Sequence, residues 1–482
     1  MLPPELESIA EEVRKRFRAA VVADEDGTRL PNLLAVEEAL VAFTQQLGLG
    51  LVEVFVDVRE QQAKAMRGLC SCGARPELHR RTTWTRQSPF GPVRVCDPYV
   101  YCRSCQSSAR PLHAWLGTER ETWSLIVEEA AVDLASDESA GKAVAKLARH
   151  HPGVEMDRTA ALRMLHAHGK EARQFIDEKL AAAAHLAELT PVERGEGAAE
   201  LEVEFDAGMI PVATLEPLPV PEDQEPELTP VRGLPKRRKN ARWEEVKAGL
   251  VQTPGKIDRL YSLRPTGGLE AAFADLFALA CMEGWTETTE VRGIADGAVH
   301  IRQRMEENFG AGDFRFILDR PHAKEHLSDA GQALQRITGT PPQQWATGAM
   351  TRLEAGEADA VVAQLEAAYL ASGADDDDRD DQLRLEAGYF RRNADAVVYA
   401  QYRAAGWSTA SSEIESAHRH IVQSRLKIAG AWWDPAHVDD ILALRMLKAN
   451  GWWDEYWQHR RRDWSRRADT LAEARHSHAH AA

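Results

Sequence analysis

The sequence predicts a multidomain α+β protein, and three observations support this prediction. Apolar residues recur at helical spacing over residues 1–65, 114–190 and 321–405. Strand-like and helix-like patterns alternate over residues 198–320. Residues 66–113 differ from both, because they form short segments rich in cysteine. A chain of 482 residues is long enough for about three domains.

The charge and hydropathy of the chain limit the classes of function. The net charge of −16 argues against nucleic-acid binding over the whole surface, although local basic clusters decide that property. Much of the acid is concentrated at 222–227 and 375–381, which we expect to be solvated loops. No uninterrupted run of about 18 apolar residues occurs, so no membrane span is expected. The charged N-terminus is not typical of a signal peptide.

The cysteine-rich segment 66–113 predicts a zinc-ribbon-like module. Five of the six cysteines lie between Cys70 and Cys105, which favours a metal site in a reducing compartment over disulfides. Two close pairs flank a short strand-like segment, and four thiolates can close a tetrahedral shell around structural Zn²⁺. The expected ligands are Cys70, Cys72, Cys102 and Cys105. Cys96 or His79 could replace one of them, and Cys281 is expected in a core.

The region 114–190 predicts a helical domain that resembles a helix-turn-helix over residues 138–169. Asp157 is positioned to cap the second helix, which would present Arg158 and Arg163 to DNA. A helical hairpin without DNA contacts is the alternative interpretation.

The region 198–320 predicts the first part of an RNase H-like core. Strands are expected at LEVEFD and MIPVATL with a tight turn at Ala207-Gly208, then a Pro-rich loop (217–240) and a third strand at 243–253. Further along, a helix (268–285), a strand (288–296), a helix (298–309) and a strand (313–319) follow. The order β-β-β-α-β-α-β is that of an RNase H-like domain. A helical insertion at 321–405, a last helix with a Trp-rich end at 406–460 and a basic, His-rich tail at 461–482 complete the chain.

Three acidic residues lie in settings typical of divalent-metal ligands. Asp206 and Asp296 each follow an apolar strand pattern, and Glu415 opens an amphipathic basic helix pattern. Mg²⁺ takes oxygen ligands and usually only one or two carboxylates per ion. Two such ions, held by carboxylates from separate elements, support phosphodiester cleavage. An ordinary Asp-Gly turn is the alternative for Asp296.

Glu413 competes with Glu415 for the role of third acid. The two side chains project about 200° apart on a helix, so only one of them can face the metals. Arg419 lies one turn beyond Glu415, where it could reach a phosphate group.

Several longer stretches resemble bacterial insertion-sequence DDE transposases of the ISKra group. They are EFDAGMIPV, RWEEVKAGLV, IADGAVHI, FILDRPHAKEHL, the block 388–433, and ILALRMLKANGWWDEYW. The resemblance covers most of 65–460 and implies a catalytic triad of Asp206, Asp296 and Glu415, because the Glu-Ser pairing of the family selects Glu415 over Glu413. It also implies two Mg²⁺ or Mn²⁺ ions, a structural zinc, double-stranded DNA as partner, a homo-oligomer on DNA, and a cytoplasmic, nucleoid-associated location.

Asp319 and His322 resemble an Asp/Cys-x-x-His motif of Mutator-like and hAT-like transposases, where it is structural or supports DNA binding. A third metal carboxylate at Asp319 is the rival role, and a simple His322–Asp319 hydrogen bond is the plainest interpretation.

Two further groups of residues have alternative interpretations. Basic residues could contact the DNA backbone or merely solvate loops; they are Lys236, Arg237, Arg238, Lys239, Arg425 and Lys427. Tryptophans near the C-terminus are expected to pack against the sheet, and base stacking is the alternative; they are Trp432, Trp433, Trp452, Trp453 and Trp457.

The leading functional hypothesis is a DNA transposase that cuts and joins strands at the ends of an insertion sequence. An inactive or domesticated transposase-derived DNA-binding protein is the second, and an RNase H-fold nuclease without transfer activity is the third. Cleavage and joining of the native element ends would distinguish the three.

Overall fold

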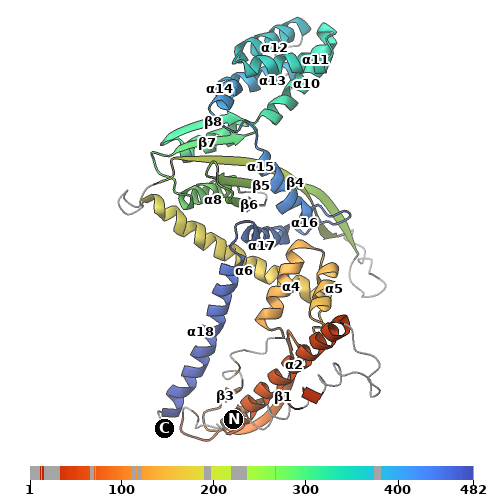
Figure 1. Ribbon diagram of the computed structural model, residues 1–482, viewed down its shortest axis with the longest axis vertical. Helices are drawn as coiled ribbons and strands as arrows, with labels where there is room; N and C mark the ends of the chain where they lie inside the picture. The colour runs from red at the N-terminus through yellow and green to blue at the C-terminus, as the bar shows by residue number, and fades with distance from the viewer. Residues whose placement is uncertain are drawn as a thin grey trace, which may run out of the picture. The chain divides into compact units, whose positions relative to one another are not determined.

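A computed structural model of the chain divides into two compact units. The N-terminal unit comprises Met1–His168 together with Trp453–Ala482, and the central unit comprises Gly169–Trp452. The N-terminal unit contains a three-stranded sheet and the central unit a five-stranded sheet, each with helices, so the α+β prediction is confirmed (Figure 1). The structure describes residues 11, 14, 15, 33–65, 70, 72–110, 112, 116, 122–188, 197–218, 229, 236–265, 268–373 and 381–480.

The N-terminal unit begins with a long helix against a β-hairpin. The helix is α2 (Leu33–Ala65), and the strands are β1 (Glu77–Ser88), β2 (Gly91–Tyr101) and β3 (Ser108–Ala109). Alternate residues of β2 face inward, as in a sheet with one buried face. They form a small core with α2 from Val56, Val93, Val95 and Leu112. The first half of the helical region predicted for 1–65, residues 1–32, lies almost entirely outside the described residues.

One stretch of α2 bears on the expectation of no membrane span. Val36–Gln62 is long and apolar enough to cross a membrane by length and composition, and it is largely unburied. Charged residues interrupt this stretch, so it is not the uninterrupted apolar run considered in the sequence. The packing of Val56 against β2 shows that one side of α2 contributes to the unit's own core.

Among the described residues, three long helices follow the cysteine-bearing segment. They are α4 (Leu125–Asp137), α5 (Ala140–His150) and α6 (Arg158–Ala184), which ends in a short 3₁₀ turn, η1 (His185–Glu188). Asp157 Oδ1 accepts a hydrogen bond from the Ala160 N–H at 2.7 Å, so the predicted cap of the second helix is confirmed. The boundary between the two units falls within α6.

The central unit is built on a sheet with the order β6-β5-β4-β7-β8. The strands are β4 (Glu200–Pro217), β5 (Arg237–Gln252), β6 (Arg259–Arg264), β7 (Glu290–Ala295) and β8 (Asp313–Leu318). β4, β5 and β6 are antiparallel, whereas β7 and β8 run parallel to β4. Parallel strands require crossover connections, and α8 (Leu269–Met282) and α9 (Val299–Phe309) lie in the connections that precede β7 and β8.

The two faces of the sheet have different chemistry. Phe205 of β4 stacks on Phe273 of α8 with ring centroids 4.6 Å apart, so α8 covers one face. Glu204 and Asp206 are neighbours of Phe205 in the strand and therefore project from the opposite face. The last helical elements pack on that face; they are α15 (Ser412–Ala417), the π-helical segment η3 (His418–Gln423), α16 (Ser424–Leu426), η4 (Pro435–His437) and α17 (Val438–Ala449).

A bundle of helices lies between β8 and α15, as predicted for 321–405 (Figure 1). Its members are α10 (Arg320–Thr338), α11 (Pro342–Glu354), α12 (Ala358–Ser372), α13 (Gln382–Arg392), η2 (Ala394–Ala396) and α14 (Tyr399–Ala404). Most of the acidic run at 375–381 lies outside the described residues.

Four details of the structure differ from the sequence prediction. The tight turn at Ala207-Gly208 does not exist, because β4 is one continuous strand in which Gly208 pairs with Val246. Residues 237–239 belong to β5 and not to a loop, although most of the Pro-rich segment lies outside the described residues. The strand β6 was not predicted, and the tail at 461–482 continues helix α18 (Trp453–His480) as far as His480.

Candidate active site

Three aspartates lie on neighbouring strands of the central sheet, with Asp206 inside β4 and Asp296 and Asp319 directly after the ends of β7 and β8. Glu204 of β4 is in register with Ile294 of β7, which is in register with Ile317 of β8. Side chains two residues apart in a strand share a face, so the residues two positions further on project from the same face of the sheet. These residues are Asp206, Asp296 and Asp319.

Asp206 is a partly enclosed carboxylate. Its side chain is 22% exposed. Burial raises the pKa of Asp206 and the charge of Asp296 raises it further, while His418 and His322 act in the opposite direction. Asp206 is therefore close enough to Asp296 for their charges to interact, which is the arrangement expected of two carboxylates that share cations.

The Asp-Gly turn fixes Asp296 at the end of β7. Asp296 Oδ1 accepts a hydrogen bond from the Ala298 N–H at 2.9 Å, and Gly297 adopts a φ of +75°. The Tyr389 hydroxyl donates to the Asp296 carbonyl at 2.6 Å. A Cβ at position 297 would lie 2.3 Å from Leu318 Cδ1, so glycine is required for its conformation and for the close approach. The turn interpretation and the site interpretation of Asp296 are thus compatible.

The structure separates the two candidate glutamates of α15. Glu413 forms an ion pair with Arg259 of β6 at 3.1 Å. Glu415 is half-buried, and within the described part of the chain its carboxylate has no hydrogen-bond or ion-pair partner. The two side chains therefore have different environments, and the one without a partner is the glutamate that the sequence resemblance selects. The oxygens of Asp206, Asp296 and Glu415 do not form a group within 4.8 Å of one another, unlike the cysteines described below.

Asp319 is fully buried, and donors occupy both of its oxygens. Oδ2 accepts from the His322 N–H at 3.1 Å and from His322 Nδ1 at 2.6 Å, and Oδ1 accepts from the Ser411 N–H at 2.7 Å. Burial alone would raise the pKa of Asp319, but the hydrogen bonds from His322 and Ser411 lower it overall. These contacts favour the structural role of Asp319 over that of a third metal ligand.

His322 carries a positive charge toward the acidic residues. The hydrogen bond to Asp319 raises the pKa of His322 to about 9 against the effect of burial, and the charges of Asp206 and Asp296 add to the increase. The ring is therefore protonated near neutral pH. Arg419, the other predicted supporting residue, is exposed on η3.

Two residues at this face were not identified from the sequence. Glu204 is buried, and burial raises its pKa to about 8. Its Oε2 accepts a hydrogen bond from the Ile414 N–H at 2.8 Å, and this bond fixes α15 to β4. His418 is 3% exposed, and its Nε2 lies 3.5 Å from Asp206 Oδ2. Two sequence patterns could have identified these residues. The acids alternate in ELEVEFD, which points to Glu204, and His418 lies three residues after Glu415.

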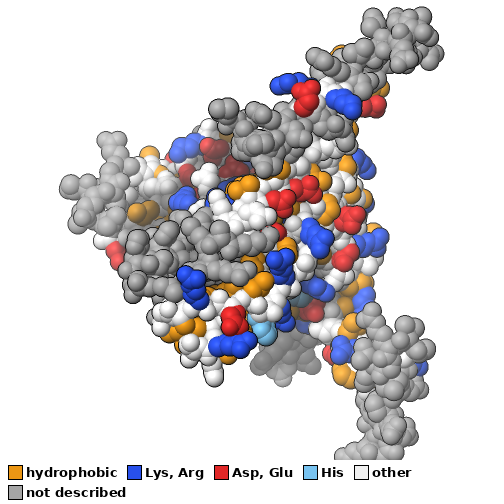
Figure 2. Space-filling model, turned by 90° about the horizontal axis from the view of Figure 1, so that it is seen from below, with side chains coloured by type: hydrophobic (Ala, Val, Ile, Leu, Met, Phe, Trp, Pro, Cys, Tyr) orange, Lys and Arg blue, Asp and Glu red, His pale blue; other side chains and the backbone are white. Residues whose placement is uncertain are grey.

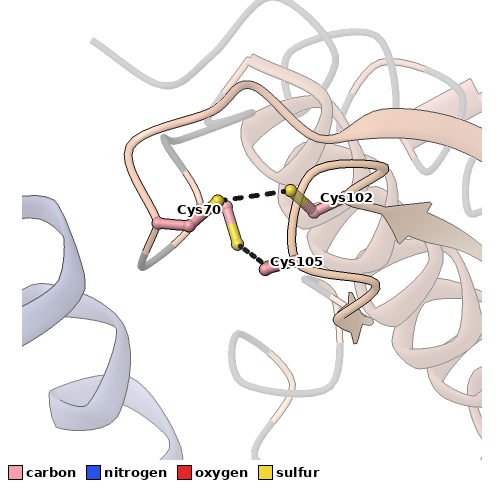
Figure 3. Close-up of side chains that lie close together, drawn as sticks. Cys70, Cys102 and Cys105 are labelled. Atoms are coloured by element: carbon pink, nitrogen blue, oxygen red, sulfur yellow. Dashed lines mark hydrogen bonds between the residues drawn. The ribbon is translucent and has the colours of Figure 1, made fainter.

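Four cysteines of the N-terminal unit form a cluster that could hold a metal ion. Their sulfurs all lie within 4.8 Å of one another, with Cys70–Cys105 at 3.3 Å and Cys72–Cys102 at 3.5 Å. Figure 3 shows the side chains of Cys70, Cys102 and Cys105 directed toward one another. Sulfurs about 2.3 Å from one tetrahedral zinc lie roughly 3.8 Å apart, so the spacing fits that ion.

The chemistry of the cluster also suits a metal. The Cys72 N–H and the Ser107 hydroxyl lower the pKa of the Cys70 thiol to about 5, which favours the thiolate that binds zinc. Against the Ala74 N–H, the neighbouring Cys102 thiol raises the pKa of Cys72 to about 11, as expected where thiols crowd together without a cation. His79 lies on β1 and Cys96 on β2, both outside the cluster, and Cys281 is buried in the central unit as expected.

Most of the predicted DNA-contacting residues are exposed, with one exception. The exposed residues are Arg158, Arg163, Lys236, Arg237, Arg238, Lys239 and Lys427. Arg425 is 1% exposed and its guanidinium lies 4.5 Å from the centre of the Trp433 ring, so it cannot contact a DNA backbone as predicted. On the face shown in Figure 2, Lys and Arg side chains alternate with Asp and Glu.

The predicted tryptophan core is only partly correct. Trp452 and Trp457 are buried, but Trp457 contacts His168 in the N-terminal unit and not the five-stranded sheet. Trp432 is 39% exposed; Lys239 Nζ lies 4.2 Å from the centre of its ring, and the ring of Trp243 lies 6.5 Å away.

Comparison with protein-family models and with curated proteins finds no match to this chain.

Proposed function

We propose that this protein is a DDE-type DNA transposase whose central unit is an RNase H-like nuclease domain. The observation that carries the proposal is the row of three aspartates on one sheet face, with the helix that bears Glu415 packed on the same face. The chain order β4-β5-β6-α8-β7-α9-β8 also supports it, because it is the β-β-β-α-β-α-β order of an RNase H-like domain, although β4 replaces the first two predicted strands and β6 supplies the third. The helical bundle between β8 and α15 corresponds to the insertion that the family resemblance implies.

The residues at this face fit divalent cations. Asp206, Asp296 and Glu415 would hold Mg²⁺ or Mn²⁺, which are hard ions that prefer carboxylate oxygens. Burial, with the charge of Asp296 added to it, raises the pKa of Asp206, and a cation between the carboxylates would offset both effects. When bound, two such ions supply an activated attacking oxygen and stabilise the leaving oxygen.

The other residues of the face would position these carboxylates and the substrate. The Tyr389 hydroxyl holds the backbone of Asp296, and the Glu204–Ile414 hydrogen bond holds the helix of Glu415. Protonated His322, buttressed by Asp319, places a positive charge beside Asp206 and Asp296. That charge would stabilise the acidic face before cations bind, and it would attract a DNA phosphate.

DNA binding would involve exposed basic residues outside this face. Arg158 and Arg163 of α6, Lys239 of β5 and Lys427 beyond α16 could contact phosphates, which position a protein on the duplex without reading its sequence. The cysteine cluster would hold a structural zinc, so that the β1–β2 hairpin could support DNA contacts. A transposase must bring two element ends together, so we expect a homo-oligomer on DNA.

The test is cleavage and strand joining with the element's own terminal repeats in the presence of Mg²⁺. Asp206→Asn, Asp296→Asn and Glu415→Gln should each reduce cleavage by several orders of magnitude and leave DNA binding nearly unchanged. Glu413→Gln is the matched control, because Glu413 lies on the same helix but pairs with Arg259. It should retain cleavage.

The outcomes also separate the alternatives. Cleavage without joining would favour a nuclease, and binding without either reaction would favour a transposase-derived DNA-binding protein. Loss of activity in Glu413→Gln with full activity in Glu415→Gln would show that the wrong glutamate was chosen.

A further inference from the structure

His418 is a buried histidine, and among the residues that the structure describes neither of its ring nitrogens has a hydrogen-bond partner. Leaving a buried polar atom unsatisfied costs about 1–3 kcal/mol, and native proteins contain few such atoms. The Asp206 carbonyl and carboxylate are near enough to act on the pKa of His418, but neither makes a hydrogen bond of acceptable geometry with its ring. An unpartnered imidazole beside a row of carboxylates therefore requires an explanation.

The position of His418 relative to Asp206 suits two ligands of one ion. His418 Nε2 lies 3.5 Å from Asp206 Oδ2. Nitrogen and oxygen ligands bind divalent metals at about 2.0–2.2 Å, which places two ligands of one ion roughly 3.0–3.5 Å apart. The observed separation lies at the upper end of that range and is long for a hydrogen bond.

The local backbone brings His418 and Glu415 to one side of their helix. The two residues are three apart, and residues at this spacing are neighbours on a helix surface. A Glu-x-x-His pair is the arrangement by which some helical carboxylate proteins hold metals. His418 also opens the π-helical segment η3, and such segments occur frequently at functional sites.

Gly208 of β4 makes room for the ring. A Cβ at this position would lie 2.7 Å from His418 Nδ1 and 2.8 Å from Cε1. Gly208 is two residues from Asp206 in the same strand, so one stretch of β4 positions both the carboxylate and the imidazole. Burial also lowers the pKa of His418, and the neutral ring is the form that binds metals.

We propose that His418 is a direct ligand of a divalent cation that it shares with Asp206. This inference rests on the proposed function only in assuming that the acidic face binds cations. Imidazole is a softer ligand than carboxylate, so the site should bind Mn²⁺ more tightly than Mg²⁺.

The test is pulsed electron paramagnetic resonance of the full-length, zinc-loaded protein with less than one equivalent of Mn²⁺. A directly bound imidazole gives a nitrogen coupling to the manganese signal, and labelling the histidines with ¹⁵N should change that coupling in the wild-type protein. His418→Ala should remove the coupling and weaken Mn²⁺ binding about tenfold or more. Gly208→Ala should weaken it as well, because the added methyl group displaces the ring.

His420→Ala is the matched control, since His420 is exposed on the same segment. It should preserve both the coupling and the affinity. Mn²⁺ bound without a histidine coupling, a coupling that persists in His418→Ala, or no Mn²⁺ binding at all would each overturn the assignment.

These results are separable from the proposed function. If the wild type cleaves DNA but shows no histidine coupling, His418 is not a ligand and the transposase proposal stands. If the coupling is present and no DNA substrate is cleaved, the assignment of His418 stands and the proposed reaction fails.

Discussion

Replacing Asp319 by asparagine should destabilise the central unit, because Asp319 joins three segments from a fully buried position. Its two oxygens accept hydrogen bonds from the backbone and ring of His322 and from the backbone of Ser411. An asparagine keeps one acceptor oxygen but turns an NH₂ group toward a donor. Either the donors of His322 or the N–H of Ser411 must then lose its hydrogen bond.

The size of the effect follows from these contacts. A hydrogen bond to a charged partner contributes about 1.5–3 kcal/mol, and the loss of an N-cap acceptor costs about 0.5–2 kcal/mol. If the charged hydrogen bond is lost and the N-cap bond is partly retained, or the reverse, the free energy of unfolding should fall by roughly 3 kcal/mol. That is a large share of the stability of an ordinary domain.

The assay is chemical denaturation of the full chain without divalent cations, followed by the fluorescence of its tryptophans. Asp313→Asn is the control, because Asp313 is exposed at the start of the same strand and should change stability by less than about 0.5 kcal/mol. A cycle with His322→Ala should show that the two substitutions are not additive. Unchanged stability in Asp319→Asn, combined with weaker Mn²⁺ binding, would refute the structural role and support a third metal carboxylate.

Three further predictions concern pH, zinc and salt. Because the pKa of His322 is raised from 6.5 to about 9 in the folded protein, its contribution to stability should be complete below pH 6.5 and lost as the pH rises through 9. The loss should be about 2 kcal/mol after allowing for solvent screening of a partly exposed ring. In denaturation measured against pH, His322→Gln should not show this loss. Elemental analysis should find about one zinc per chain, and Cys102→Ser with Cys105→Ser should remove it and unfold the β1–β2 hairpin while circular dichroism still reports a folded central unit. DNA affinity should fall linearly with salt on logarithmic axes, and Lys239→Ala should reduce the slope by about 0.9, whereas an unchanged slope would exclude a phosphate contact at Lys239.

The sequence predicted the elements of the central unit well where local patterns determine them. The helices α8 and α9 and the strands β7 and β8 have strong periodicity and clear turns at their ends, and each was predicted close to its observed bounds. β6 was missed because it is short and begins and ends with arginine. Arg264 lies there because Asp275 of α8 pairs with it at 2.6 Å, a contact that no local pattern reveals.

The errors at the candidate site have a common physical cause. Gly208 was interpreted as a turn residue, but it is a place where a histidine from a distant segment approaches the strand closely. Arg425 was interpreted as a DNA contact, but it is buried against Trp433. In each case the role of the residue depends on a partner whose position is determined by the tertiary fold.

β4 connects the two ends of the candidate site. It carries Asp206, and its neighbouring residues hold the helix of Glu415: Glu204 accepts the Ile414 N–H, and Gly208 accommodates the ring of His418. Asp319 fixes the start of the same helix through Ser411. Glu415 therefore lies between two anchored points, one on each side of it in the chain, although 210 positions separate Ile414 from Glu204. A carboxylate held in this way is constrained by strands and not by a loop, and that rigidity is what metal-dependent phosphodiester chemistry requires of its ligands.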